Sequence, residues 1–238
     1  MIDIATIAPN PTATSLDEGW LAGSWTDFRQ QADRPESAAA QCFYHDGWFL
    51  IDMSPVGPLH GRDNTLLSAI ILLYAMQQGI RVHGYTNTSF QKPGEREAQP
   101  DIAFYLGADR RLPPANNAIV DLDQYAPANN AIVDLDQYAP PTLVIEIAAS
   151  SLNADLGFKR LLYEQLGIQE YWVVDSVQSQ VMAFGIDQGR SGMIETSAVL
   201  PNLSIALVSA ALQRSQQESQ GETLQWLMQQ WTQAEQTG

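Results

Sequence analysis

The sequence predicts an α/β domain built around a mixed β-sheet that is flanked by helices. Three observations support this prediction. The chain has 238 residues, of which 45 % are apolar, and this is enough for a sizeable core. Strand patterns occur in two groups, and each group follows a segment with a helical pattern. One strand pattern, at 142–148, is apolar on both faces, which is typical of a central strand covered by helices.

The first elements belong to an extension and to the start of the domain. Residues 1–40 are rich in Ser, Thr, Ala, Asp and Pro, and they predict a loosely structured N-terminal extension with one short helix. The predicted domain covers residues 41–210. It opens with two apolar runs around the tripeptide His-Asp-Gly at 45–47, a hairpin signal because Asp-Gly tolerates positive φ. Residues 59–79 are a predicted core helix that contains no proline and ends at Gly79.

Strand-like segments follow this helix. Residues 80–90 and 101–106 are predicted strands, and the charged segment 91–100 between them is a predicted loop. The strand at 142–148 comes next along the chain, after a repeated segment.

That segment, residues 114–139, contains the 13 residues PANNAIVDLDQYA twice without change. Two short copies are too few for a solenoid. The repeat therefore indicates a duplication in a surface loop, where insertions cost little. Its four aspartates lack the glycine and the distal glutamate of a calcium-binding loop, which argues against a calcium site. They are Asp121, Asp123, Asp134 and Asp136.

The second half predicts a helix and more strands. Residues 150–167 have a helical pattern, 170–176 and 180–186 are predicted strands, and 194–207 are predicted to add a further strand. Residues 211–238 form a Gln-rich C-terminal helix.

One face of this C-terminal helix is apolar. It carries Leu224, Leu227, Met228 and Trp231. The helix is expected to dock on the core or on a sister subunit, so a homodimer is one expectation.

Charge limits the possible partners. The chain has 12 basic and 27 acidic residues and a net charge of −15. This charge repels polyanions at long range and argues against unspecific nucleic-acid binding. A phosphodiester substrate remains compatible with it, because a divalent metal brings positive charge and needs carboxylate ligands.

The lone cysteine, Cys42, excludes an internal disulfide framework and a Cys-rich zinc module, and it is expected to be a small core residue. No run of about 18 apolar residues could span a bilayer. The first residues lack the pattern of a signal peptide, so a cytoplasmic location is expected.

Glu146 is a carboxylate in the apolar strand at 142–148. Burying it requires a cation, a metal or its own proton as partner. A structural ion pair is one explanation. The other involves Asp101, which opens the strand at 101–106; alone it would be a turn or cap residue. Two carboxylates at the ends of adjacent strands can converge on one divalent cation.

The helix that follows carries Asp155, Lys159 and Tyr163 at a spacing of i, i+4 and i+8, so they share one face. An exposed intrahelical ion pair, worth a few tenths of a kcal/mol, is the simple explanation. The helix begins just after the strand of Glu146, however, so Lys159 could reach a water on a bound metal.

At these residues the sequence resembles a known family, the Uma-two family of "putative restriction endonucleases", bacterial members of the PD-(D/E)XK nuclease superfamily. The similarity covers about residues 43–186. Three stretches carry it: YHDGWFLIDMSPVGPLHG, QPDIAFYL and LVIEIAASSLNADLGFKRLLYEQLGIQEYWVVD.

The resemblance implies a restriction-endonuclease-like fold, with Asp101 and Glu146 as metal-binding acids. It implies that Lys159 is the catalytic lysine, carried by the helix in this family. The superfamily usually places this lysine two residues after the Glu, where this chain has Ala148. His60 matches a family histidine that is a further metal or substrate ligand; from the sequence alone it would be a hydrogen-bonding residue at a helix start.

The expected activity is hydrolysis of DNA by an endonuclease that depends on Mg²⁺ or Mn²⁺, with Asp155 and Tyr163 supporting the site. The chain departs from the family pattern Glu-x-x-Ser-Pro-Ser-Thr, since residues 149–152 are Ala, Ser, Ser and Leu. This departure and the net charge keep an alternative open, a nuclease-fold protein that binds or regulates without turnover.

Overall fold

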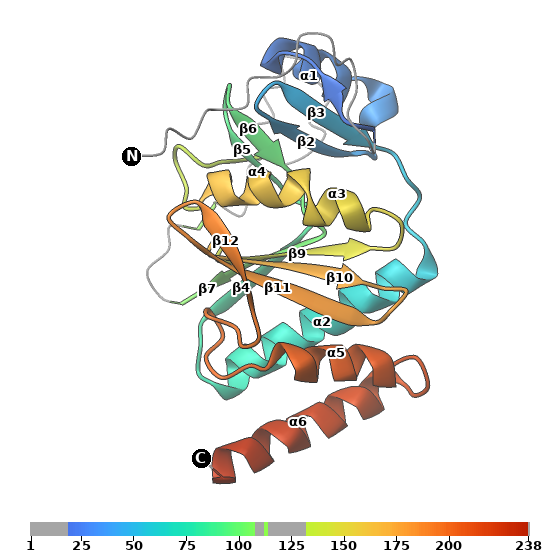
Figure 1. The fold of residues 1–238 in the computed structure, drawn as a ribbon, viewed down its shortest axis with the longest axis vertical. Helices are drawn as coiled ribbons and strands as arrows, with labels where there is room; N and C mark the ends of the chain where they lie inside the picture. The colour runs from blue at the N-terminus through green and yellow to red at the C-terminus, as the bar shows by residue number, and fades with distance from the viewer. Residues whose placement is uncertain (1–18, 108–111, 114–131, 238) are drawn as a thin grey trace, which may run out of the picture.

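Two mixed β-sheets and the helices that cover them make up the fold in the computed structural model, which describes residues 19–107, 112–113 and 132–237 (Figure 1). The predicted α/β architecture, with a mixed sheet flanked by helices, is confirmed. The second sheet is an addition that the sequence did not predict. None of the described helices is both long enough and apolar enough to cross a membrane.

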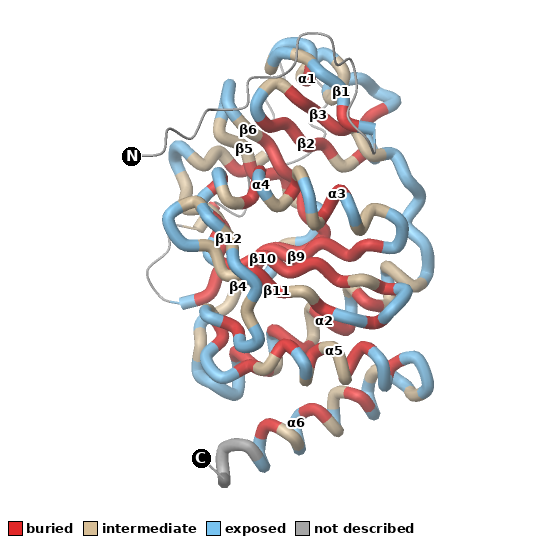
Figure 2. Tube along the Cα trace, in the orientation of Figure 1, coloured by how far each residue is buried: buried red, intermediate tan, exposed pale blue. Residues whose placement is uncertain are grey.

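One sheet, called sheet B, contains the strands next to the predicted acidic residues. Its strand order is β12-β11-β10-β9-β7-β4, and β9 and β10 are parallel while the other neighbours are antiparallel. All six residues of β9 are buried, which confirms the predicted central strand (Figure 2). The strands are β4 (Val82–Thr86), β7 (Ile102–Leu106), β9 (Leu143–Ala148), β10 (Glu170–Asp175), β11 (Gln180–Asp187) and β12 (Arg190–Ile194).

The other sheet, called sheet A, has the order β1-β3-β2-β6-β5-β8. Its β2–β3 turn has Asp46 at φ 47° and Gly47 at φ 79°, so the predicted Asp-Gly hairpin is confirmed. The strands are β1 (Leu21–Ala22), β2 (Gln41–His45), β3 (Trp48–Asp52), β5 (Ser89–Lys92), β6 (Arg96–Ala98) and β8 (Ile132–Asp134).

The charged segment 91–100 is not only a loop, because it supplies part of β5 and all of β6. Glu97 is buried in β6, where Arg29 and Gln91 donate hydrogen bonds of 2.9 and 2.7 Å to its Oε2. Charge was therefore a misleading signal here, since this carboxylate has buried partners. Gly94 forms the turn at φ 80°.

Part of the repeat also belongs to a sheet. Its first copy and the start of the second, with Asp121 and Asp123, lie outside the described residues. In the described part, β8 pairs in parallel with β5 and Val133 is buried. These residues form an edge strand, and the surface-loop prediction is wrong for them.

The helices form layers with the sheets (Figure 1). The pair α3 and α4 lies between sheets A and B, whereas α2 and α5 cover the opposite face of sheet B and α6 packs outside them. The helices are α1 (Trp25–Ala32), η2 (Pro35–Ser37), α2 (Pro58–Gln77), α3 (Leu152–Leu156), α4 (Phe158–Leu166), α5 (Ile205–Arg214) and α6 (Gln220–Thr237).

The helix predicted over 150–167 is divided at Gly157, whose ψ of −108° separates α3 from α4. A Cβ atom at this position would lie 2.8 Å from the carbonyl oxygen of Asn153, so only glycine fits without a shift of the backbone. The helix ends at Gly167, as predicted, with a left-handed φ of 78°.

Two other segments differ from the prediction. Ile194 ends β12, and residues 195–207 form bends, turns, one isolated bridge and the start of α5, so the strand predicted over 194–207 is wrong. The C-terminal region has two helices, and Leu227 and Trp231 of α6 are buried against the protein's own core, with the Trp231 ring 4.9 Å from that of Tyr74. At the other end, β1 is the edge strand of sheet A next to β3, and α1 packs on β2 and β3.

Candidate active site

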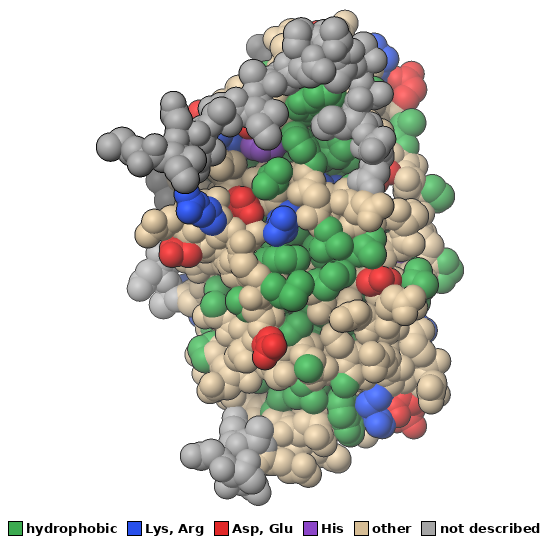
Figure 3. All heavy atoms as spheres, viewed as in Figure 1, with side chains coloured by type: hydrophobic (Ala, Val, Ile, Leu, Met, Phe, Trp, Pro, Cys, Tyr) green, Lys and Arg blue, Asp and Glu red, His purple; other side chains and the backbone are tan. Residues whose placement is uncertain are grey.

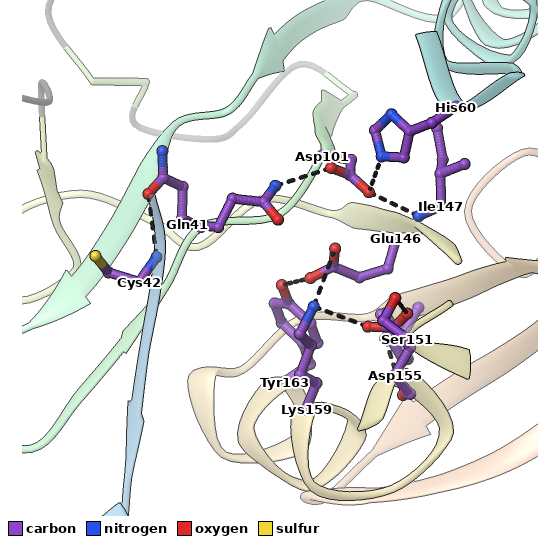
Figure 4. A network of polar contacts seen from close by, with 12 residues as sticks. Gln41, Cys42, His60, Asp101, Glu146, Ile147, Ser151, Asp155, Lys159 and Tyr163 are labelled. Carbon is purple, nitrogen blue, oxygen red and sulfur yellow. Dashed lines mark hydrogen bonds and ion pairs between the residues drawn. The ribbon is translucent and has the colours of Figure 1, made fainter. Parts of the chain in front are cut away.

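Asp101 and Glu146 are brought together by the pairing of β7 with β9. The two strands are antiparallel with Ile102 opposite Ile145, so Asp101, the residue before Ile102, lies beside Glu146, the residue after Ile145. The backbone N–H of Ile147 donates a 2.7 Å hydrogen bond to Oδ2 of Asp101. Both acids are almost fully buried, with exposures of 3 % and 1 %. They line one cavity of about 70 Å³ together with Lys159. Figure 4 shows the side chains of Asp101, Glu146 and Lys159 pointing toward one another.

Asp101 accepts hydrogen bonds on both of its oxygens. Gln41 Nε2 donates to Oδ1 at 2.8 Å, and His60 Nε2 lies 3.1 Å from Oδ2. Burial on its own raises the pKa of Asp101, but the hydrogen bond and charge of His60 and the Ile147 amide outweigh it, so the pKa is lowered. Asp101 is therefore a carboxylate at neutral pH.

His60 lies in the first turn of α2, at the edge of the cavity. Its hydrogen bond with Asp101 raises its pKa, and burial only partly offsets this effect. Its Nδ1 has no hydrogen-bond partner among the described residues. In this structure His60 contacts Asp101, while its predicted role as a metal or substrate ligand stays a prediction.

Glu146 faces the helix pair. The hydroxyl of Tyr163 donates to its Oε1 at 2.5 Å, and Lys159 Nζ lies 3.7 Å from its Oε2. Burial raises the pKa of Glu146 well above its ordinary value, because it outweighs the attraction of Lys159. Burial and the nearby Glu146 also raise the pKa of Tyr163, which keeps this hydroxyl protonated and able to donate.

Lys159 is held by a second carboxylate. Its Nζ lies 2.8 Å from Oδ1 of Asp155, and it sits 4.2 Å from the centre of the Phe43 ring. Burial lowers the pKa of Lys159, but Glu146 and Asp155 together outweigh burial and raise it, so the ammonium stays charged. Asp155, Lys159 and Tyr163, the three residues predicted to share one helix face, are all buried. An exposed ion pair therefore does not explain them.

Two residues of this network were not predicted. Ser151 donates a 2.6 Å hydrogen bond to Oδ2 of Asp155, and Gln41 binds Asp101. A hydroxyl four residues before Asp155 was a usable signal for Ser151, since such side chains meet at a helix start. Gln41 had no such signal, because it is 60 residues away from its partner.

The donors around the cavity suit a small, hard cation. Among the described residues, no three His, Cys, Asp or Glu side chains gather closely enough to hold a metal by themselves. Mg²⁺ commonly uses one or two protein carboxylates and takes its other ligands from water and phosphate. Asp101 and Glu146 meet this requirement, and a cavity of about 70 Å³ has room for an ion and a water.

The fold and this arrangement of buried acids define a restriction-endonuclease-like protein. A crystal structure of a putative nuclease belonging to DUF820 from Anabaena variabilis ATCC 29413 is similar, with a TM-score of 0.50 and 17 % sequence identity. The match covers 72 % of this chain and 90 % of that one. At this identity the similarity shows the fold.

The family follows from the sequence match. The model of the family Uma2, described as "Putative restriction endonuclease", matches residues 25–220, so the chain belongs to this family. The resemblance seen in the sequence is thus confirmed. A comparison with functionally curated proteins finds no match.

Proposed function

We propose that this protein is a metal-dependent endonuclease that hydrolyses phosphodiester bonds of DNA. The observation that carries the proposal is the meeting of three buried side chains, Asp101, Glu146 and Lys159, in one small cavity. Family membership supports the nuclease class. The chemistry of the three side chains supports the reaction type.

Asp101 and Glu146 would hold Mg²⁺ or Mn²⁺. When bound, the cation would polarise the scissile phosphate and lower the pKa of a bound water. The three donors on Asp101 orient its carboxylate, and Tyr163 holds one oxygen of Glu146 in place. An orientation fixed in advance spares the protein the reorganisation that would otherwise accompany the reaction.

Lys159 would act on the substrate side of the site. Its raised pKa keeps it cationic, so it can stabilise negative charge that develops on the phosphate or orient the attacking water. Asp155 fixes the ammonium at 2.8 Å, and Ser151 fixes Asp155 in turn. Asp155 therefore holds Lys159 directly, and Ser151 holds it indirectly through Asp155.

A second candidate function is binding or regulation without turnover. The charge of −15 favours it. Lys and Arg side chains are scattered singly on the face in Figure 3 and form no basic patch there that would attract duplex DNA. The cavity offers Lys159 and His60 as its basic lining residues, and each already contacts a carboxylate.

Calorimetric titration with Mn²⁺ separates the two candidates. The endonuclease hypothesis expects binding to the wild type and loss of binding in Asp101→Ala. Absence of binding to the wild type supports the scaffold without turnover. Asp134→Ala is a matched control, because this aspartate forms its hydrogen bonds within its own turn and does not line the cavity.

A further inference from the structure

One hydrogen bond joins sheet A to the predicted metal-binding acid of sheet B. Gln41 begins β2 in sheet A, and Asp101 lies directly before β7 in sheet B. The side-chain amide of Gln41 donates to Oδ1 of Asp101 at 2.8 Å (Figure 4). The other oxygen, Oδ2, is already taken by Ile147 and His60.

The chemistry of Asp101 fixes the direction of this bond. An ionised carboxylate can only accept hydrogen bonds, so Gln41 must present its NH₂ group rather than its carbonyl oxygen. Gln41 is therefore the donor that holds Oδ1, in the way that Ile147 and His60 hold Oδ2. Three donors from three different elements surround one carboxylate.

The backbone around Gln41 is fixed to the segment that leads to Asp101. The N–H of Cys42 donates to Oε1 of Gln99 at 3.3 Å, and Nε2 of Gln99 donates to the carbonyl oxygen of Asn87 at 3.0 Å. Gln99 precedes Asp101 by two residues. The start of β2 and the start of β7 therefore keep their relative position, and Gln41 needs little freedom to reach Asp101.

We propose that Gln41 is a positioning residue for Asp101, so that sheet A completes the metal site that sheet B carries. This inference rests on the proposed function. Residues that hydrogen-bond a metal ligand orient it, and their loss typically weakens metal affinity about 10- to 100-fold. The role proposed for Gln41 is to act through Asp101.

The test is Mn²⁺ titration of Gln41→Met, a side chain of similar length without a donor. The dissociation constant for Mn²⁺ is expected to rise about 10- to 100-fold. Gln41→Asn keeps the amide but shortens its reach, and it should also weaken Mn²⁺ binding. It is the second variant to test, in case Gln41→Met does not fold.

Gln91→Met is the matched control. Gln91 also lies in sheet A and also donates to a buried carboxylate, Glu97, at 2.7 Å, but it does not line the cavity. It should lower the melting temperature and leave Mn²⁺ affinity unchanged. Unchanged affinity in both Gln41 variants overturns the inference, and so does an equal loss in Gln91→Met. A wild type that binds no Mn²⁺ contradicts the proposed function itself, and the inference falls with it.

Discussion

Lys159 on α4 faces Glu146 on β9 at a distance of 3.7 Å, and their side chains are only 3 % and 1 % exposed. A pair with so little exposure affects stability differently from a surface ion pair. Removing one partner leaves the other buried without compensation, which typically costs about 3–5 kcal/mol. A substitution at either residue is therefore expected to lower stability, apart from any effect on the proposed activity.

Lys159→Met should lower the free energy of unfolding by about 3 kcal/mol, because Glu146 and Asp155 lose their shared cation. Urea denaturation of the purified variant measures the change. Lys92→Met is the control, since the ion pair of Lys92 with Glu95 is exposed and worth at most about 1 kcal/mol. Equal losses in the two variants would contradict the buried pair.

Tyr163→Phe removes the hydroxyl that donates to Glu146 and should impair both stability and nuclease activity. A stability loss of about 1–2 kcal/mol is expected for this buried hydrogen bond. Tyr171→Phe loses a comparable buried bond, to the carbonyl oxygen of Asp155, without touching either acid. If Tyr163→Phe and Tyr171→Phe have the same stability and the same nuclease activity, Tyr163 has no role in the site.

Asp63 should make the protein less stable as pH rises. It is fully buried on α2, and burial raises its pKa, with Ser176, Arg62 and His60 offsetting only part of the effect. The folded state therefore binds its proton more tightly than the unfolded state, and stability falls as pH rises from the ordinary value of about 4 through the raised pKa.

Asp63→Asn removes this titration. The variant is expected to gain about 1 kcal/mol over the wild type at pH 7 and to lose this advantage toward pH 4. Thermal unfolding of both proteins across this range gives the difference, in which the other titrating groups cancel. A gain that does not depend on pH would show that Asp63 is not the group responsible.

One copy of the repeat should be dispensable. Deleting 13 residues from either copy yields the same sequence, and that sequence retains every residue type now found in β8. Loop length has a weak effect on closure entropy, so the melting temperature should change by no more than about 2 °C. Calorimetry of the shortened chain tests this, and loss of cooperative unfolding would show that both copies are needed.

Local patterns predicted much of this structure. The Asp-Gly hairpin at 45–47, the core helix at α2 and the apolar strand β9 have signals that lie within a few residues, and each formed as expected. The proximity of Asp101, Glu146 and Lys159 was also predicted, because they lie on two adjacent strands and on the helix that follows the second strand.

Features set by distant partners were not accessible in this way. Gln41 and Asp101 meet only because β2 of one sheet passes beside the start of β7 of the other. The charge of Glu97 favoured a loop over a strand in the prediction, because its partner, Arg29, lies 68 residues away and could not be recognised. Residues 194–207 contain apolar residues that suit a strand, yet Ile205 is buried in a helix.

Cleavage of plasmid and single-stranded DNA in the presence of Mg²⁺ or Mn²⁺ tests the central claim most directly. The wild type should cut, a chelator should stop the reaction, and Glu146→Ala should abolish it. Glu164→Ala, a carboxylate on the same helix as Lys159 but outside the cavity, should retain activity. A wild type that leaves both substrates intact with either metal, or a Glu146→Ala variant that cuts as well as the wild type, would contradict the account.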